Sequence, residues 1–290
     1  MKITIFTPIY NRAYIIENLY RSLLRQSCMD FEWLVVDDGS TDNTTELFTD
    51  WMSRENPFPI RYYTQPNGGK CRAINRGLDL AQGELFFTVD SDDYLTDDAV
   101  EKVLRWEAEL PRTELYCGIA GNLGTATNIT PNRIFEKAYH DGTALDRYCN
   151  VDGERAMVFY TAIHRQYPYP AFSGENFMTE AVAWNRMAAD GYKMRFYNDI
   201  IWIYEYKDDG LTKVGNRLFL NNPRGYGLWL WEKSRFLGES LIKRLKMYYT
   251  FACDLSGSLD EATIAECIGA PKILIAGAVT LHNIIEKVRK

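Results

Sequence analysis

The sequence predicts an α/β fold with a mostly parallel sheet covered by helices on both faces, followed by a helical C-terminal part. Over the first 110 residues, short and almost continuously apolar runs alternate with helical patterns. The connections between them are short, which favours parallel strands buried on both faces. A polar cluster also follows each apolar run, and ligands of parallel sheets collect at the carboxyl ends of the strands.

The elements of this first part can be assigned in order. KITIFTP is a strand, and a helix follows with apolar residues at helical spacing from Ile16 to Leu24 and Asn11 as a candidate N-cap. EWLVVDD is the second strand, before a helix over residues 42–53. IRYYTQ and residues 69–81 repeat the pattern. ELFFTVD is the fourth strand, and a helix from about Asp97 to Glu109 ends the series.

The later part of the chain is less regular. Residues 121–170 are rich in Gly, Thr, Asn and Tyr without a clear period, which favours long loops that face a second substrate. A helical pattern returns from Met178 to Ala189, and KMRFYN and IIWIYEY are two candidate strands. Stretches 225–251 and 271–290 predict two or three further helices. We therefore divide the chain into residues 1–110, 111–210 and 211–290.

Composition excludes several classes of protein. The 290 residues are 46% hydrophobic, which is enough for a large core, and the net charge of -6 argues against a nucleic-acid partner. Six cysteines without C-x-x-C spacing and three dispersed histidines do not predict a zinc site. Since MKITIFTPIY enters a strand pattern directly, we expect a cytoplasmic protein with reduced thiols.

Three carboxylates follow the fourth strand. Asp90, Asp92 and Asp93 stand at the end of a buried apolar run, where they repel one another unless a positive charge lies among them. Carboxylates that converge at a strand end suit a hard divalent cation such as Mg²⁺ or Mn²⁺, completed by phosphates and waters. Alternatively, Asp93 or Asp97 caps the next helix, and D-x-D triplets are common by chance.

Two more segments carry polar groups to the same edge. After the second strand, a carboxylate of VVDDGSTDNT can accept a hydrogen bond from a uracil-like base, or Asp38 and Ser40 can cap the second helix, and both interpretations stay open. NGGKCRAINRG has two glycines before a helix start and then basic residues, among them Lys70. Such a segment favours an anion such as a diphosphate, although a solvated basic loop has the same composition.

Together these segments resemble the family 2 glycosyltransferases of the GT-A fold. TPIYNR, VVDDGSTDNT, NGGKCRAINRG and VDSDDY follow the family's order over about residues 1–110. The resemblance implies an inverting transfer of a hexose or N-acetylhexosamine from a nucleotide-activated donor, usually a UDP-sugar, with Mn²⁺ or Mg²⁺. Residues 1–110 would bind the nucleotide sugar, 111–210 the acceptor, and 211–290 would form a helical extension.

The resemblance also implies roles for single residues. Asp92 would ligate the metal that bridges the two phosphates, and would thereby take part in catalysis. Asp90 would lie near the donor ribose, and Asp93 would support the metal site or contact the sugar. The other implied donor-site residues are Thr7, Pro8 and Tyr10 around the nucleotide, Asp38 facing the base, and Asn67 and Lys70 near the nucleotide or diphosphate.

Inverting transfer further needs a general base for the acceptor hydroxyl. The family usually places it in a Glu-Asp pair that opens a helix, and MTEAVAWNRMAADGYK is the corresponding stretch here. Thr179-Glu180 stands in place of the pair, so Glu180 is the expected base, with a side chain one methylene longer than Asp. Glu175 is a rival, and Glu180 can also be an ordinary carboxylate in a first helical turn.

The acceptor is less defined. Resemblance to transferases of bacterial surface polysaccharides suggests a glycan or lipid-linked glycan, to which one sugar is added, since no Q-x-x-R-W signature is present. Residues 271–290 have too short an apolar centre to span a bilayer and suit a peripheral membrane helix, a core helix or a homodimer interface. Two alternative functions stay open. A sugar nucleotidyltransferase normally has a basic Gly-rich loop directly after the first strand, where this chain has TPIYNR instead. The second alternative is a catalytically silent module that binds nucleotide sugars.

Overall fold

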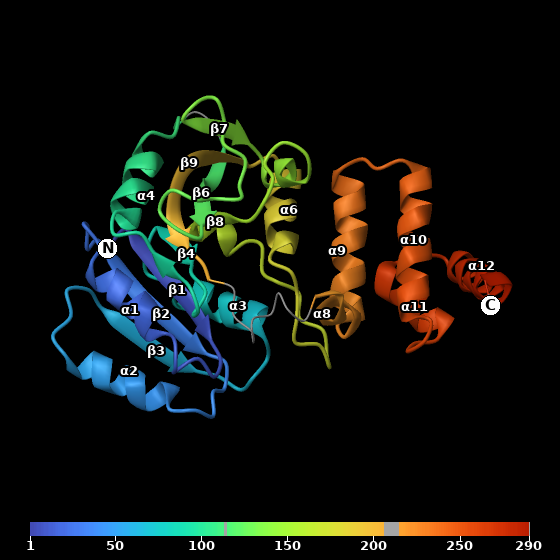
Figure 1. Ribbon diagram of the computed structural model, residues 1–290, viewed down its shortest axis with the longest axis horizontal. Coiled ribbons are helices and arrows are strands. Elements are labelled where there is room, and N and C mark those ends of the chain that lie inside the picture. The colour runs from blue at the N-terminus through green and yellow to red at the C-terminus, as the bar shows by residue number, and fades with distance from the viewer. Residues whose placement is uncertain (113–114, 206–214, 290) are drawn as a thin grey trace. The chain divides into compact units, whose positions relative to one another are not determined.

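A computed structural model describes residues 1–112, 115–205 and 215–289 of the protein (Figure 1). The chain divides into two compact units. The first comprises Met1–Pro168 and Arg186–Lys207, and the second comprises Tyr169–Asn185 and Asp208–Lys290. The boundary thus groups residues 169–185 with the C-terminal helices, whereas the sequence suggested a cut near residue 210.

The first unit begins with the predicted alternation of strands and helices. Its elements are β1 (Ile3–Ile9), α1 (Glu17–Leu24), β2 (Phe31–Asp37), α2 (Thr44–Ser53), β3 (Ile60–Thr64), α3 (Lys70–Leu80), β4 (Leu85–Thr88), a short β5 (Tyr94–Leu95) and α4 (Ala99–Ala108). Strands β1 to β4 pair in parallel in the order β3-β2-β1-β4. The predicted parallel half of the sheet is confirmed.

The sheet continues into the middle of the chain. The elements there are β6 (Tyr116–Gly124), β7 (Tyr139–Gly142), the 3-10 helix η1 (Ala144–Tyr148), β8 (Arg155–Tyr160), α5 (Thr161–His164), α6 (Ala181–Ala189) and β9 (Lys193–Ile203). Beyond β4 the strand order is β8-β6-β9-β5, with β7 also on β9. Strand β8 runs antiparallel to β4 and β6, so the mostly parallel fold of the prediction ends in a mixed edge.

Two expectations for this region need correction. Residues 121–170 contain the end of β6 and all of β7 and β8. The sequence pattern did not predict these strands, because they are short or contain polar residues. KMRFYN and IIWIYEY form one strand, β9, rather than two. Its pairing with β6 shifts between Phe196 and Ile200, and this irregularity interrupts the apolar pattern without ending the strand.

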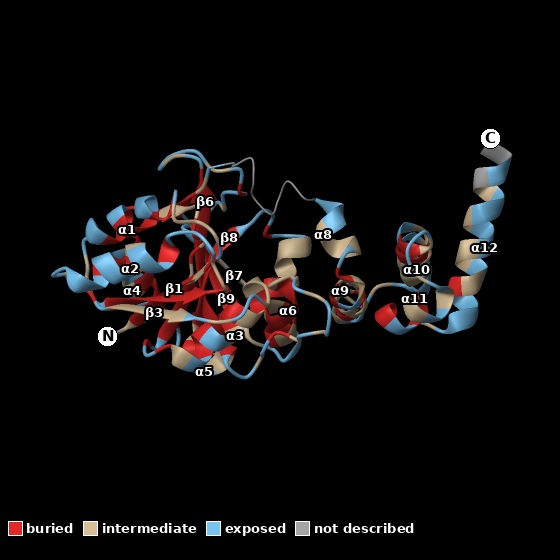
Figure 2. Cartoon of the chain, turned by 90° about the horizontal axis from the view of Figure 1, so that it is seen from below, coloured by how far each residue is buried: buried red, intermediate tan, exposed pale blue. Residues whose placement is uncertain are grey.

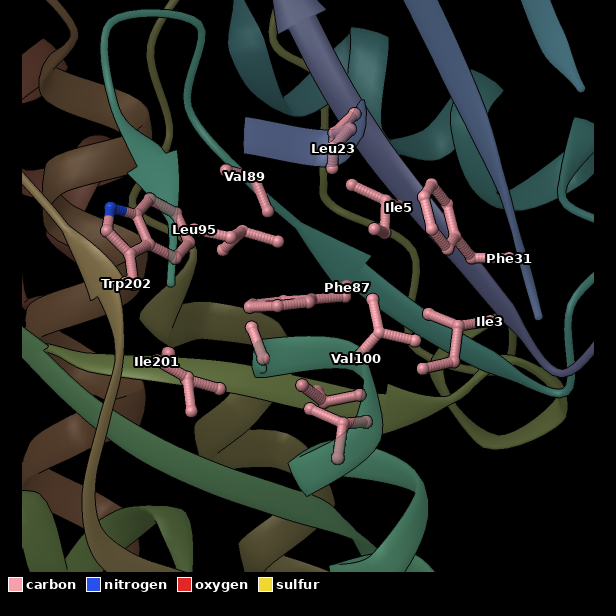
Figure 3. Packing of buried hydrophobic residues seen from close by; sticks show 14 of the residues in the cluster. Ile3, Ile5, Leu23, Phe31, Phe87, Val89, Leu95, Val100, Ile201 and Trp202 are labelled. Atoms are coloured by element: carbon pink, nitrogen blue, oxygen red, sulfur yellow. The ribbon is translucent and has the colours of Figure 1, made fainter. Parts of the chain in front are cut away.

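Helices cover both faces of the sheet (Figure 2). Helices α1, α2 and α4 pack on the face that carries Ile3, Ile5, Trp33 and Phe87 (Figure 3). Helices α3 and α5 lie on the opposite face. There Gly77 of α3 lies against the ring of Phe6, so closely that an added Cβ would be 2.2 Å from the ring. The missing side chain lets α3 approach β1 closely.

The second unit is helical. Within described residues 215–289 it contains α8 (Asn216–Leu220), α9 (Pro223–Phe236), α10 (Leu241–Leu255), α11 (Glu261–Ile268) and α12 (Lys272–Arg289). Gly238 at φ +60° and the N-cap Ser240 divide the run 225–251 into α9 and α10. With α12 these are the three helices predicted, and the short helices α8 and α11 lie outside the predicted stretches. None of the helices in the described ranges is long and apolar enough to cross a membrane.

The contact between α3 and β1 gives a first prediction. Gly77→Ala forces the Phe6 ring to move, and we expect it to destabilise the protein by about 1–3 kcal/mol despite the better helix propensity of Ala. Gly277→Ala on α12, where nothing lies within 4 Å of the new Cβ, is the control and should stabilise by up to about 1 kcal/mol. Equal unfolding midpoints for the two variants would contradict this packing.

Candidate functional site

The carboxyl ends of β1 to β4 meet at one edge of the sheet. Backbone hydrogen bonds continue the parallel ladders past the strand ends, from Val89 N to Phe6 O at 2.8 Å, from Asp38 N to Ile9 O at 2.8 Å and from Gln65 N to Asp37 O at 2.9 Å. The segments that follow these strands are therefore held side by side. We call this edge, formed by residues 10–13, 38–44, 65–70 and 90–93, the rim.

The acidic turn, residues Asp90 to Asp93, follows β4 on the rim. It is closed by a backbone hydrogen bond from Asp93 N to Asp90 O at 3.3 Å. Lys70, the first residue of α3, places its Nζ 2.6 Å from Oδ1 of Asp90. The predicted basic residue and the predicted carboxylates are thus brought together, with Lys70 in an ion pair with Asp90.

The carboxyl groups of the acidic turn lie in surroundings that disfavour their ionised forms. Burial and the charge of Asp90 raise the pKa of Asp92 above its usual range, although Arg12 and Lys70 act in the opposite direction. Burial, with the charges of Asp90 and Asp92, also raises the pKa of Asp93 to about 8. Both carboxyls therefore favour the approach of a further positive charge.

The turns after β1 and β2 hold each other through side chains. Asn11, at φ +52°, accepts a hydrogen bond from Thr41 N at 2.7 Å, and its own N–H donates to Ser40 Oγ at 2.9 Å. Asp42 accepts from Ala13 N at 3.0 Å. Asn11 is therefore not the N-cap of α1, because its side chain joins two loops of the rim instead.

Asp38 and the glycine loop form a second closed unit of the rim. The Asp38 carboxylate is 4% exposed and accepts hydrogen bonds from Gln65 Nε2 at 2.7 Å, Gly68 N at 3.0 Å and Gly69 N at 2.6 Å. The anion that these two glycine amides bind is thus the carboxylate of Asp38. Neither Asp38 nor Ser40 caps α2, because each side chain bonds across the rim.

The remaining predicted donor residues divide by exposure. Thr7 is fully buried, and its Oγ1 accepts from Trp33 Nε1 at 3.1 Å, because strand alternation turns it into the core beside Ile5 and Ile9. Its side chain points into the core, and the role implied for Thr7 at the nucleotide stays a prediction. Pro8 is half-buried, Tyr10 is 48% exposed, and exposed Asn67 donates from Nδ2 to Asp38 O at 2.9 Å.

The described residues limit how a metal can be held. In ranges 1–112, 115–205 and 215–289, no three His, Cys, Asp or Glu side chains are grouped to bind an ion by themselves. A cation beside Asp92 would need most of its ligands from another molecule. Mg²⁺ is commonly bound in this way, with one or two protein carboxylates and with substrate phosphates and water as the remaining ligands. The oxygen donors and unbalanced charge of the acidic turn fit such an ion.

The two candidate bases lie in the second unit and differ in their contacts. Glu175 accepts hydrogen bonds from Arg224 N at 2.7 Å and Gly225 N at 2.9 Å, which are amides of the first turn of α9. It therefore caps α9. Glu180 immediately precedes α6, and Thr179 Oγ1 accepts from Ala181 N at 3.3 Å. Thr179 thus provides the capping contact of α6.

Two residues of the acidic turn's surroundings were missed from the sequence. Arg12 belongs to the TPIYNR segment, whose place after β1 already pointed to the rim. Trp202 of β9 donates from Nε1 to Oδ2 of Asp93 at 2.8 Å. Trp202 is 109 residues away from Asp93 in the chain, and no local pattern links the two.

The model of one protein family, described as glycosyl transferase family 2, matches residues 4–168. This is more than half of the chain and includes every segment of the rim. The chain belongs to glycosyl transferase family 2. The predicted family is thereby confirmed.

Curated family 2 relatives match in part. Chondroitin synthase of Pasteurella multocida is 40% identical over 103 residues, which are 36% of this chain and 10% of that protein. Glycosyltransferase GlyA of Streptococcus pneumoniae is 24% identical over 227 residues, 73% of this chain and 32% of that protein. The putative teichuronic acid biosynthesis glycosyltransferase TuaG of Bacillus subtilis is 34% identical over 107 residues. The match covers 42% of TuaG and 37% of this chain. The chain therefore spans less than half the length of each of these three relatives.

Solved structures share the fold over almost the whole chain. S. aureus TarS 1-349 in complex with UDP-GlcNAc has a TM-score of 0.60 and 17% identity, covering 97% of this chain and 88% of that one. A mannosyltransferase from Pyrobaculum calidifontis in complex with GDP-Man and Mn²⁺ has a TM-score of 0.58 and 17% identity, covering 98% and 80%. These likenesses confirm the predicted GT-A fold with its C-terminal helices.

The acidic turn predicts a dependence of stability on pH. The Asp93 carboxyl has an ordinary pKa of 3.8 and a folded-state pKa of about 8, so the folded state holds its proton more tightly. Its contribution to stability is fully present below about pH 4 and is lost as the pH rises through about 8. Asp93→Asn, which keeps an oxygen for the Trp202 N–H, should reduce the loss of unfolding free energy between pH 5 and 8.

The measurement is urea unfolding in buffer with a chelator, with exposed Asp97→Asn as the control. Asp97 pairs with Arg25 at 3.0 Å on the surface and should leave the slope with pH unchanged. The same pH dependence in wild type and Asp93→Asn would show that Asp93 is not held in a charged and buried cluster.

Proposed function

We propose that the protein transfers one sugar from a nucleotide-sugar donor, most directly a UDP-sugar, to a glycan or lipid-linked glycan with inversion at the anomeric carbon. The observation that carries the proposal is the acidic turn at the carboxyl edge of the sheet, where Lys70 Nζ lies 2.6 Å from Asp90 Oδ1. Family 2 membership and the likeness to a TarS structure with UDP-GlcNAc support the donor class. The likeness to transferases such as TuaG supports a role in surface polysaccharide synthesis.

The donor would lie along the rim. We assign its diphosphate to the acidic turn and Lys70, whose ammonium is already positioned by Asp90. The nucleoside would contact the half-buried Pro8 and the exposed Tyr10 at the end of β1. Asp38 is the proposed contact of the base. Because its carboxylate is occupied by Gln65 and the glycine amides, base recognition would require at least one of these hydrogen bonds to be exchanged.

A divalent cation, Mn²⁺ or Mg²⁺, would be held by Asp92 and by oxygens of the diphosphate. When bound, it supplies positive charge that stabilises the nucleoside diphosphate as this departs. Asp92 is the suited ligand, since Asp90 is engaged with Lys70 and Asp93 with Trp202. The raised pKa of Asp92 follows from burial and unbalanced charge, both of which a cation would offset.

The proposed general base is Glu180. Its carboxylate would accept the proton of the acceptor hydroxyl as the oxygen attacks the anomeric carbon. The capping role of Glu175 favours this choice, because both of its oxygens accept hydrogen bonds from the first amides of α9. A carboxylate committed to a helix terminus is a poor proton acceptor.

Asp92→Asn tests the metal ligand. We expect transfer to fall by about 100-fold or more, because the charge on the leaving diphosphate loses its stabilisation. Asp97→Asn, the matched control outside the acidic turn, should keep wild-type turnover. Sugar release from a panel of UDP-sugars with Mn²⁺ gives the rates, and thermal unfolding verifies the fold. Wild-type turnover in Asp92→Asn would refute the assignment. Release of pyrophosphate from UTP and a sugar 1-phosphate, supplied in a separate assay, would instead indicate a nucleotidyltransferase.

Glu180→Gln and Glu175→Gln separate catalysis from capping. With Glu180→Gln, we expect transfer to fall by about 100-fold or more while UDP still binds, since only the proton acceptor is lost. Glu175→Gln should retain transfer and lose about 1 kcal/mol of stability, because the α9 amides lose a charged partner. Calorimetric binding of UDP and single-turnover rates distinguish the two. An inactive Glu175→Gln beside an active Glu180→Gln would reverse the roles.

A further inference from the structure

Trp202 holds the acidic turn from the opposite half of the sheet. Its indole N–H donates to Oδ2 of Asp93 at 2.8 Å, and only 7% of the residue is exposed. The bond joins β9, the last strand along the chain, to the turn between β4 and β5. A hydrogen bond from an indole N–H to a carboxyl group is strengthened when the carboxyl group is ionised.

The ring of Trp202 cannot easily turn away. The backbone ladder pairs Leu95 of β5 with Trp202, and Thr96 N donates to Ile201 O at 3.1 Å. On its face toward the core, the indole packs edge-on against Phe87 of β4, with ring centroids 5.9 Å apart. Figure 3 shows the indole nitrogen on the side of the ring that faces away from Leu95 and Phe87. Packing thus fixes the direction in which the N–H points.

Without the Trp202 N–H, the Asp93 side chain would be held less firmly. Asp93 directly follows Asp92 in the acidic turn, and the Trp202 N–H is a side-chain donor to its carboxyl group at 2.8 Å. The backbone bond that closes the acidic turn, from Asp93 N to Asp90 O, is long at 3.3 Å. The side-chain bond from Trp202 is therefore the shorter of two ties on Asp93, and Asp92 is its neighbour in the turn.

We propose that Trp202 is a positioning residue, whose indole N–H fixes the Asp93 carboxylate and thereby keeps Asp92 in the one arrangement that receives a metal-bound nucleoside diphosphate. This inference rests on the proposed function. It adds that donor binding depends on Trp202 of β9, which acts through Asp93. A purely structural Trp202 would affect stability and leave the affinity for the metal and diphosphate unchanged.

Trp202→Phe tests the inference, because it removes the N–H and keeps an aromatic ring against Phe87. The control is Trp106→Phe, which removes an indole from a buried stack on Tyr197 away from the acidic turn. Calorimetry measures UDP binding at a series of Mn²⁺ concentrations. We expect the affinity of Trp202→Phe to fall by about 10-fold or more, as for other residues that orient a metal ligand. Trp106→Phe should match the wild type.

A double-mutant cycle with Asp93→Ala provides the second readout. If Trp202 acts through Asp93, adding Trp202→Phe to Asp93→Ala should cost no further affinity. Additive losses, or wild-type affinity in Trp202→Phe, would overturn the inference. Should Trp202→Phe not fold, Asp93→Ala alone must lose Mn²⁺-dependent UDP binding, and retention would overturn the inference equally. A wild-type protein that does not bind UDP with Mn²⁺ would instead refute the proposed function.

Discussion

Repulsion among three carboxylates at the end of a buried strand is the constraint on which the rim depends. Strand β4 must be apolar to lie in the middle of the sheet, and Asp90 follows it after one buried residue, Val89, so the three carboxyl groups are only partly exposed. Three contacts reduce this repulsion. Lys70 pairs with Asp90, the charge of Arg12 acts on Asp92, and the indole N–H of Trp202 donates to Asp93. The proposed cation and its diphosphate would add positive charge and ligands at this same turn.

The same rim shows how loops are made rigid without regular structure. Asn11 and Asp42 tie the turn after β1 to the turn after β2, and Asp38 ties the turn after β2 to the glycine loop. Each tie is a side-chain oxygen that accepts backbone N–H groups. Such bonds satisfy amides that no ladder or helix uses, and they hold the loops to one another. Rigid loops of this kind lower the entropy cost of binding a donor.

Local patterns predicted much of this protein. The order of strands and helices through α4 followed from apolar runs and helical spacing, and the parallel pairing expected for these strands placed Asp38, Lys70 and Asp90 on one rim. What failed were contacts between distant segments. The Trp202 bond to Asp93 and the capture of Asp38 by the glycine loop depend on tertiary register, which no local spacing encodes. Strand alternation would have turned Thr7 inward, had β1 been assigned its face from Ile3 and Ile5.

Anomalous diffraction from crystals that contain the protein with UDP and Mn²⁺ tests the central claim most directly. The account predicts a manganese peak at coordination distance from an Asp92 oxygen, with the diphosphate on its other side and Lys70 close by. A diphosphate seated elsewhere, or a well-ordered UDP on the rim with no metal peak beside Asp92, would contradict it.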